Sequence, residues 1–347
     1  VNNVIFHVIY PTYLIAPPKF SHRVRCETAM CIISIIRLVS PQTGWCIFSL
    51  LFVDRKAMEI NMIYFCADDY GISTYGNSRI ENCLENGVLN KVSVLPNGEI
   101  SDFKQRLAGT NTTLSLHINL VEGRPLSEPN DIDLLISDNG YFKYSFIGLF
   151  FLSISNKRKE FEKQVYTEIQ SQIKFWKKAT DENTSISIDS HQHTHMIPLI
   201  FKTLMRVIED EGLNVQSIRI PAEPISPYVF TPSLYFEYNL IGLIKQWLLK
   251  TFALVNRREL KKSKIQSAYF MGILFSGKLN EARIRKLLPH YLKLAKKHNK
   301  NIEIGFHPGY IKDGEKLLDG SRQDFRKFYF SPWRNIEHET LINFKFE

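Results

Sequence analysis

The residues best suited to chemistry form one short cluster, Asp189-Ser-His-Gln-His-Thr-His195. It places three of the ten histidines within five positions, directly after the apolar run Ile186-Ser-Ile188. Because alternate side chains of a strand share one face, this spacing lets several imidazoles point at one place. Imidazole is both a metal ligand and an acid–base group near neutral pH, so the cluster predicts a metal site or an acid–base site.

A second motif, Ala67-Asp68-Asp69-Tyr70-Gly71, places two carboxylates side by side at the end of an apolar run. Both can reach one pocket where a chain turns, so that one binds a metal while the other takes a proton. The structural alternative is that one of them caps a helix beginning near Ser73. His117 ends another apolar run, and with His191 and one aspartate it would form a ligand set with open positions. Such sets are typical of hydrolytic or oxygenase centres and not of structural ones.

Short β-rich runs alternate with helical ones from Met62 onward. Amphipathic helices, with apolar residues three and four apart, are predicted around Ile80–Leu84, Phe161–Trp176, Ile200–Ile208 and Ile284–Leu292. The candidate strands between them are 62–67, 91–95, 113–118, 185–189, 216–220, 268–274 and 302–306. This alternation predicts a parallel α/β architecture.

Polar residues follow most of these strands, which favours a closed barrel over an open sheet. Asp68, His117, His191, Arg219 and His307 each come at or just after the end of a different strand. Side chains from so many strand ends converge at the mouth of a barrel. We therefore predict a distorted TIM-like barrel of about seven βα units. Two long insertions, 122–160 and 222–266, are rich in aromatic residues and interrupt it.

Charge and cysteine content indicate which binding partners and which cell compartment to expect. The formal net charge of +9 is spread over several predicted helices. The densest basic run, 257–264, has no aromatic residues for stacking on bases, so it predicts a solvated helix face and no nucleic-acid binding. The five cysteines are odd in number and show no C-x-x-C spacing. This usage indicates a reducing compartment, and we expect a cytoplasmic protein.

Residues 1–61 differ from the rest of the chain. They contain three of the five cysteines, show no lasting periodicity, and hold apolar stretches too short to span a membrane. Because the first regular strand follows Met58 and Met62, we expect 1–61 to be an extension, from a misassigned upstream start or added outside the native gene. A single domain is predicted for 62–347.

Five ordered motifs together resemble the YdjC/ChbG family of carbohydrate deacetylases. The resemblance covers roughly residues 62–310 and leaves 1–61 without a counterpart. The motifs are Ala-Asp-Asp-Tyr-Gly at 67–71, Leu-His-Ile-Asn-Leu at 116–120, Asp-Ser-His-Gln-His-Thr-His at 189–195, Arg-Ile-Pro-Ala-Glu at 219–223 and Phe-His-Pro-Gly-Tyr at 306–310.

The resemblance implies a TIM-barrel-like enzyme that removes N-acetyl groups from amino sugars such as chitooligosaccharides. Carried over by position, Asp69, His117 and His191 would bind one divalent ion, magnesium or zinc. Asp68 would be the general base and His307 the general acid.

The remaining polar residues of the motifs would line or support the site. Arg219 would orient Asp68 or hold substrate, and His193, His195 and Glu223 would contact substrate or support the ligands. A structural alternative pairs Arg219 with Glu223 in a buried ion pair. His307, which precedes Pro308 and Gly309, has the alternative of bracing a turn.

Two other functions stay open at this point. The aromatic and apolar stretch 228–254, with the basic run after it, would suit a deacetylase acting on a glycolipid or a carrier-linked sugar at a membrane surface. A membrane surface is nevertheless not the expected partner. The other function is that of a non-catalytic sugar-binding relative, although every candidate catalytic position holds a competent residue. The expected partner is an acetylated sugar, and a homo-oligomer is left open.

Overall fold

The computed structural model describes residues 37–39, 46–48, 62–107, 112–180, 185–238, 240–309, 311, 314–321 and 323–346. The chain divides into two units, Val1–Met58 and Glu59–Glu347. In the first unit, β1 (Arg37–Val39) pairs antiparallel with β2 (Cys46–Phe48). The other residues of 1–61 lie outside the described part of the chain, so the expectation of a misassigned start stays a prediction.

The second unit is built on a seven-stranded sheet in which every neighbouring pair of strands is parallel. The strands are β3 (Ile63–Tyr70), β4 (Lys91–Val94), β5 (Thr113–Ile118), β6 (Ile186–Ser190), β7 (Val215–Ile218), β8 (Tyr269–Met271) and β9 (Ile302–Phe306). They coincide with the seven strands predicted from the sequence. All five residues of β9 are buried, including Glu303, whose carboxylate pairs with Lys91 and Arg219.

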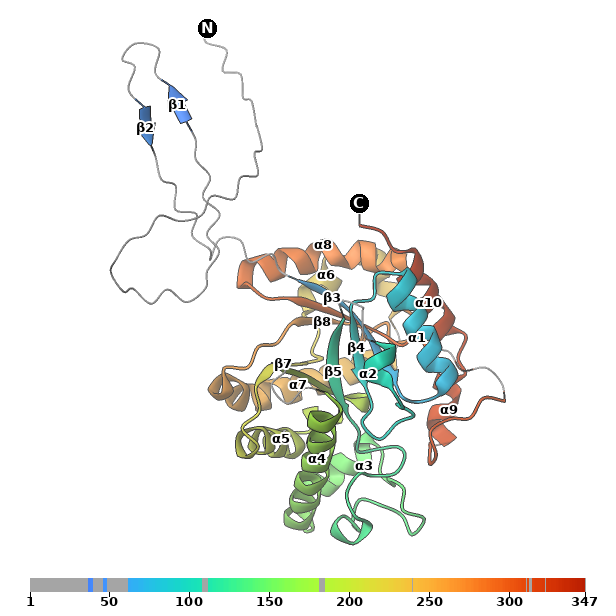
Figure 1. Ribbon diagram of the computed structural model, residues 1–347. Helices are drawn as coiled ribbons and strands as arrows, with labels where there is room; N and C mark the ends of the chain where they lie inside the picture. The colour runs from blue at the N-terminus through green and yellow to red at the C-terminus, as the bar shows by residue number, and fades with distance from the viewer. Residues whose placement is uncertain are drawn as a thin grey trace, which may run out of the picture. The chain divides into compact units, whose positions relative to one another are not determined.

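The strand order β7-β6-β5-β4-β3-β9-β8 follows the chain around a curled sheet, with one interruption between β7 and β8 (Figure 1). At that seam, Ser217 and Gln266 form an isolated parallel bridge, and the N–H of Ile218 donates to the carbonyl of Gln266 at 3.0 Å. The predicted α/β class is therefore confirmed, and the sheet is a curled, incomplete barrel.

The predicted strand 268–274 ends early, at Met271. Gly272 has a φ of 139°, which turns the backbone out of the sheet. The N–H groups of Gly272, Ile273 and Leu274 then donate to the carboxylate of Glu223 at 2.6, 2.9 and 3.2 Å. A buried carboxylate thus replaces a neighbouring strand as their hydrogen-bond partner.

The helices on the outer side of the sheet have the predicted amphipathic character. Ser73 and Asn280 cap two of them, by accepting from the N–H of Gly76 at 2.9 Å and of Arg283 at 3.0 Å. The predicted helices correspond to α1 (Thr74–Asn86), α4 (Arg158–Ala179), α5 (Pro198–Asp210) and α8 (Glu281–His298); α2 (Phe103–Arg106), α9 (Gln323–Tyr329) and α10 (Trp333–Asn343) are further helices.

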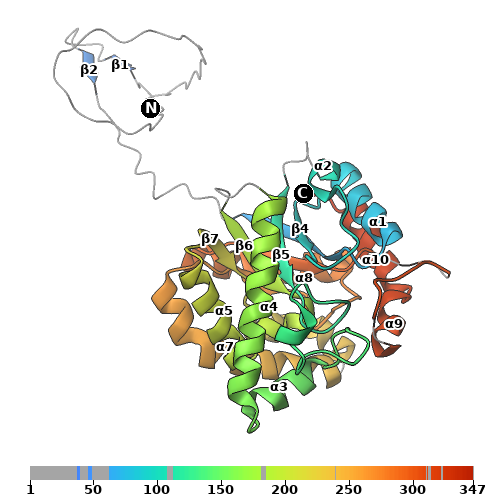
Figure 2. The same cartoon turned by 60° about the horizontal axis from the view of Figure 1, so that its bottom comes forward.

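Two long connections carry additional helices, where the sequence predicted aromatic-rich segments. The β5–β6 connection holds η2 (Pro129–Asp131) and α3 (Phe146–Ile154) ahead of α4. The β7–β8 connection holds α6 (Ile225–Val229), η4 (Pro232–Glu237) and α7 (Leu240–Ser263). Helices α3 and α7 lie side by side (Figure 2), joined by the rings of Phe146 and Phe150 against Phe252.

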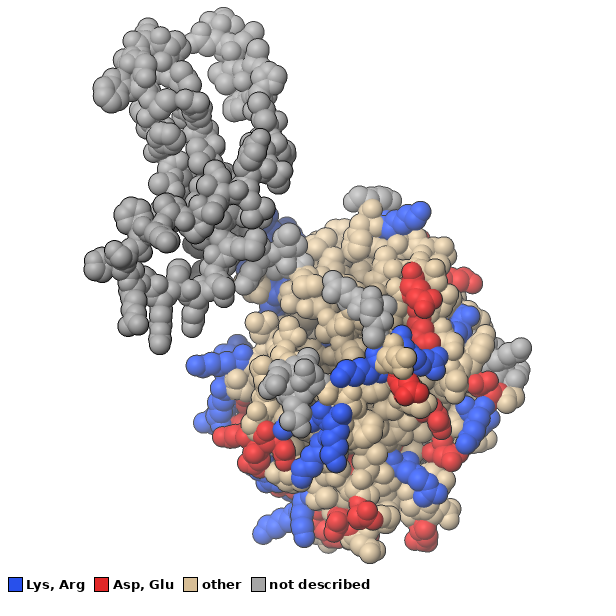
Figure 3. Space-filling view, in the orientation of Figure 1, with Lys and Arg blue, Asp and Glu red and all other residues tan. Residues whose placement is uncertain are grey.

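Charged side chains on the surface are mixed in sign. On the face drawn in Figure 3, lysines and arginines are interspersed with aspartates and glutamates. Among the helices in the described part of the chain, none has the combination of length and apolar character needed to cross a membrane.

Candidate functional site

The predicted site residues gather around a cavity of about 500 Å³ at the carboxyl ends of the strands. The carboxyl ends of parallel strands meet at one edge of a sheet, which is where such folds place their active sites. Asp68, Asp69, His117, His191, His193 and His307 all line this cavity, together with residues of α3, α7 and the α9 region.

Asp68 and Asp69 both reach the cavity because β3 is irregular at its end. The pairing of β3 with β4 shifts between Ala67 and Tyr70, and Asp69 has a φ of 71°. This bend breaks the strict alternation of a strand, so adjacent side chains reach the same space. Ser73, and neither aspartate, caps α1.

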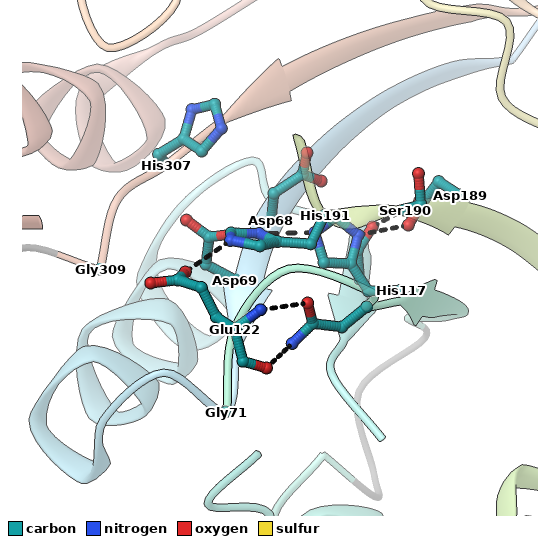
Figure 4. Close-up of polar contacts among 12 residues, drawn as sticks. Asp68, Asp69, Gly71, His117, Glu122, Asp189, Ser190, His191, His307 and Gly309 are labelled. Atoms are coloured by element: carbon teal, nitrogen blue, oxygen red, sulfur yellow. Dashed lines mark hydrogen bonds and ion pairs between the residues drawn. The ribbon is translucent and has the colours of Figure 1, made fainter. Parts of the chain in front are cut away.

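Asp69, His117 and His191 form a cluster of possible metal ligands (Figure 4). Oδ1 of Asp69 lies 2.9 Å from Nδ1 of His191 and 3.7 Å from Nε2 of His117. All three side chains are buried. The structure therefore brings together the carboxylate and two imidazoles proposed as ligands.

One atom of this cluster points to a cation. Nε2 of His117 is buried and has no hydrogen-bond partner among the residues that the structure describes, while its Nδ1 lies 2.5 Å from Oδ1 of Asp189. With the Nδ1 proton donated to Asp189, the lone pair of Nε2 faces Asp69. Two imidazoles and a carboxylate within 4.8 Å of one another fit a divalent ion. Imidazole donors favour zinc or a similar transition metal over magnesium.

Asp189 lies behind His117 and contacts several other buried side chains. Its Oδ2 accepts from the hydroxyls of Ser93 at 2.6 Å and Ser115 at 2.9 Å, and lies 3.1 Å from Nη2 of Arg219. Burial by itself would raise the pKa of Asp189, but Arg219 and His117 outweigh burial and hold this pKa well below its usual range. The ionised carboxylate therefore fixes which nitrogen of His117 faces the cavity.

His191 is held from its other side by Glu122 and Tyr329. Its Nε2 lies 2.8 Å from Oε2 of Glu122 and 3.1 Å from the hydroxyl of Tyr329, which also donates to Glu122. Burial lowers the pKa of His191, yet Asp69 and Glu122 reverse this effect and raise the pKa to about 10. The surrounding carboxylates thus favour positive charge at this position.

Arg219 binds Asp68 through two hydrogen bonds. Nη1 and Nη2 of Arg219 donate to Oδ2 and Oδ1 of Asp68 at 2.6 and 2.8 Å, and Nε donates to Glu303 at 2.6 Å. Burial would raise the pKa of Asp68, but Arg219 and His117 lower it. The alternative ion pair of Arg219 with Glu223 is wrong, because Glu223 accepts from the backbone beyond β8 instead.

The histidine cluster does not continue the strand. Strand β6 ends at Ser190, and Gln192 and His193 have positive φ values of 53° and 60°. The expectation that alternate positions share one face is therefore wrong beyond Ser190. His193 still lines the cavity, with a buried Nδ1 that has no hydrogen-bond partner within the described part of the chain. His195 turns away, with Nδ1 2.5 Å from Oγ of Ser190 and Nε2 2.8 Å from the carbonyl of Arg219.

His307 lies on the loop after β9, apart from the three clustered residues (Figure 4). The backbone N–H of His307 donates to Oε2 of Glu337 at 2.6 Å, and the ring Nδ1 lies 3.6 Å from the same oxygen. Glu337 therefore holds the loop in place, while the ring of His307 lines the cavity. Both the bracing of a turn and a contact with substrate are compatible with this position.

A family model described as YdjC-like protein matches residues 62–347. The chain belongs to the YdjC-like family. Proteins named carbohydrate deacetylase are similar to it: one from Thermoanaerobacter pseudethanolicus is 28% identical over 46% of this chain and 61% of its own length. One from Geobacillus stearothermophilus is 26% identical over 61% of this chain and 81% of its own length. One from Xenopus laevis is 32% identical over 45% of this chain and 49% of its own length.

The matched part of this YdjC-like chain spans 61% of the Thermoanaerobacter protein and 54% of a carbohydrate deacetylase from Danio rerio. Among solved structures, a protein from Enterococcus faecalis described as a cellobiose-phosphate cleavage protein has a TM-score of 0.54 at 15% identity. This similarity covers 81% of this chain and 90% of that one, and it supports the fold alone.

Several residues of the YdjC-like site were not predicted from the sequence. Arg334 is buried on α10; its Nη2 lies 2.5 Å from Oδ2 of Asp69, and its Nη1 donates to the carbonyl of Gly309 at 2.9 Å. It lies beyond the motifs, in a helix that carries several other polar residues, so the sequence does not single it out. Glu122 directly precedes Gly123, but nothing local marks it as a partner of a distant histidine.

Lys245, on α7, also lines the cavity. Burial lowers its pKa, against the opposing effect of Glu223, Asp68 and Asp69. No motif or spacing distinguishes it from the other lysines of 222–266. A second cavity, of about 640 Å³, lies at the opposite end of the sheet, where Tyr64, Lys91 and Thr113 begin or flank their strands. It contains none of the clustered ligands.

Proposed function

We propose that the domain 62–347 is a metal-dependent N-deacetylase that hydrolyses the acetamide of an amino sugar or oligosaccharide and releases acetate. The single observation that carries the proposal is the cluster of Asp69, His117 and His191, with the unpartnered Nε2 of His117 facing Asp69. The names of the related carbohydrate deacetylases support the substrate class. In this proposal the domain is a TIM-like barrel with 122–160 and 222–266 as its insertions.

The proposed ligands are Asp69, His117 and His191, and the proposed ion is zinc. A divalent ion held there lowers the pKa of a bound water toward about 7 and polarises a carbonyl oxygen. Asp189 and Glu122 orient the two imidazoles by accepting or facing their second nitrogens. Arg334 holds the second oxygen of Asp69 and so fixes the first one toward the histidines.

Asp68 is the proposed general base. Its lowered pKa keeps it ionised, so its carboxylate can accept the proton of the attacking water. Arg219 holds that carboxylate at both oxygens, which fixes its orientation. The water oxygen bonds to the acetamide carbon, the C–N bond breaks, and the amine nitrogen takes a proton from His307. His193 and Lys245 line the same cavity and are proposed to contact substrate.

Acetate release from N-acetylglucosamine oligomers tests this function directly. We expect release that is lost with a chelator and restored by zinc more fully than by magnesium. Asp69→Ala should lose both bound metal and activity, while the matched surface change Asp210→Asn should keep both. Asp210 accepts from the hydroxyl of Tyr166 at 2.9 Å, outside the cavity. Unchanged acetate release by Asp69→Ala would contradict the assigned metal site.

A further inference from the structure

Helix α7 is apolar on the side that faces solvent. Its buried positions include Gly242, Gln246 and Asn256, two of which carry polar amides. A helix that only covers a sheet shows the reverse arrangement, with its apolar stripe inward. The outer stripe is Leu240, Ile241, Ile244, Trp247, Leu254 and Val255, with exposed fractions of 72, 80, 57, 70, 65 and 58%.

Helix α3 adds to this apolar surface. Ile147, Phe151 and Ile154 are spaced by four and three residues, so they share one helix face, and their exposed fractions are 51, 61 and 63%. The two helices are joined by the aromatic contacts of Phe252 with Phe146 and Phe150. Contiguous apolar surface of this kind marks an interaction site on a protein and is not ordinary surface variation.

The apolar surface is continuous with the candidate active site. Ile147, Ile241 and Ile244 line the cavity that contains the ligand cluster, and each is also more than half exposed. The α7 wall of the cavity continues inward with Leu248 and Leu249. Apart from Lys245, this wall is aliphatic, whereas a sugar ring binds best against a flat aromatic face with polar groups beside it. An alkyl chain would fill this wall and remove it from water.

The charge of α7 indicates what covers the outer stripe. Steps of four residues lead from Leu254 to Arg258 and Lys262, both exposed, so the stripe becomes basic toward the end of the helix. Arg257 and Lys261 are exposed beside them. Among these residues the acidic group is Glu259, which lies 3.2 Å from Lys262. Apolar side chains next to a cluster of lysines and arginines suit the interface of an anionic bilayer.

We propose that α3 and the outer stripe of α7 lie in the interface of an anionic lipid bilayer, and that the substrate is an acetamido sugar carried on an apolar chain. The apolar chain of the substrate would leave the cavity between α3 and α7, past Ile147 and Ile244. The substrate class rests on the proposed deacetylase function. The bilayer contact rests on the surface alone, so the two can fail separately.

Vesicle binding tests the contact with the bilayer. The full chain should sediment with vesicles of phosphatidylcholine and phosphatidylglycerol, and less with phosphatidylcholine alone. Trp247→Asp and Leu254→Asp, which do not line the cavity, should each weaken binding by roughly tenfold to a hundredfold. Leu292→Asp is the matched control, because Leu292 is an exposed leucine on α8, outside the cavity. Arg258→Glu with Lys262→Glu should remove the preference for the anionic vesicles.

Acetate release from two synthetic sugars tests the substrate class. One is N-acetylglucosamine with a methyl group at its anomeric oxygen, and the other carries a long alkyl chain there and is presented in anionic vesicles. The alkyl sugar should have the higher kcat/KM by at least roughly tenfold, since several methylenes leave water. Trp247→Asp should lose this preference and keep its rate on the methyl sugar.

The outcomes separate the two proposals. Absence of vesicle binding, or equal binding by Trp247→Asp and the unchanged chain, would overturn the bilayer contact even if the methyl sugar is deacetylated. Equal kcat/KM for the two sugars would overturn the substrate class. Vesicle binding that depends on the outer stripe, without acetate release from either sugar, would support the contact and overturn the deacetylase function.

Discussion

Replacing Asp189 with Asn should weaken metal binding without changing any proposed ligand. Oδ1 of Asp189 lies 2.5 Å from Nδ1 of His117, and Oδ2 accepts from Ser93 and Ser115 near Arg219. Asparagine has the same shape but one acceptor and one donor. If its oxygen faces His117, its NH₂ group faces Nη2 of Arg219, which is also a donor. If it is flipped, it can no longer accept the proton of His117.

The expected loss of metal affinity and stability in Asp189→Asn follows from the hydrogen bonds that the Asp189 carboxylate accepts. Changing the group that orients a histidine ligand costs about tenfold to a hundredfold in metal affinity, which is about 1.4–2.7 kcal/mol. The metal-free protein also loses one charge-assisted hydrogen bond, worth about 1.5–3 kcal/mol. Arg219 keeps Asp68 and Glu303 as partners, so we do not expect the larger cost of a fully unpaired buried charge.

Two measurements check these values. Competition against a chelator of known affinity gives the dissociation constant for zinc, and thermal unfolding of the chelated protein should show a Tm lower by about 3–10 °C. Asp210→Asn is again the matched control, because it makes the same chemical change outside the cavity. Zinc affinity of Asp189→Asn within about twofold of the unchanged chain would refute the role of Asp189 in orienting His117, since the expected loss is tenfold or more.

Three further changes probe the rest of the site. Arg334→Met removes the partner of Asp69 and should lower the free energy of unfolding of the chelated protein by about 3 kcal/mol in urea; an unchanged urea midpoint would argue against it. His307→Gln should reduce kcat for acetate release by about 10²–10⁴, while elemental analysis shows the same metal content; loss of the metal would instead make His307 a ligand. Glu223→Gln removes the charge that three N–H groups share and should cost about 2 kcal/mol in the same urea titration, with zinc affinity unchanged; a loss of affinity would link Glu223 to the ligands.

The strands, and the meeting of His117 and His191 with the Asp68-Asp69 pair, could be predicted because both depend on local sequence, whereas the choice of Asp69 came from the family resemblance. Strands covered on both faces are apolar runs, and polar residues directly after them must lie at one edge of a parallel sheet. The same reasoning placed Asp68 and His307 at the cavity. It failed for the alternation of the histidines, because the turn at Gln192 depends on backbone angles that no residue of the cluster marks.

The partners of the ligands could not be predicted, because they come from distant parts of the chain. Asp69 and Arg334 are 265 residues apart in sequence, and Glu122 and Tyr329 are 207 apart. Such pairs depend on how the helices after β9 fold back over the cavity. No spacing rule connects them, and an isolated arginine or tyrosine on a helix is ordinarily a surface or core residue.

At the seam between β7 and β8, the connection between the two strands can change in length at a small cost in stability. A closed ring of strands fixes the length of each connection through its neighbours, but here the two edges meet through the bridge of Ser217 with Gln266 and the hydrogen bond from Ile218 to Gln266. Lengthening a loop costs only about 0.6 kcal/mol for each doubling. The segment that crosses the seam also supplies α7 to the cavity, whereas Asp69, His117 and His191 are positioned by β3, β5 and β6. Changes in this one segment can therefore reshape the α7 wall of the cavity without altering the strands that position Asp69, His117 and His191.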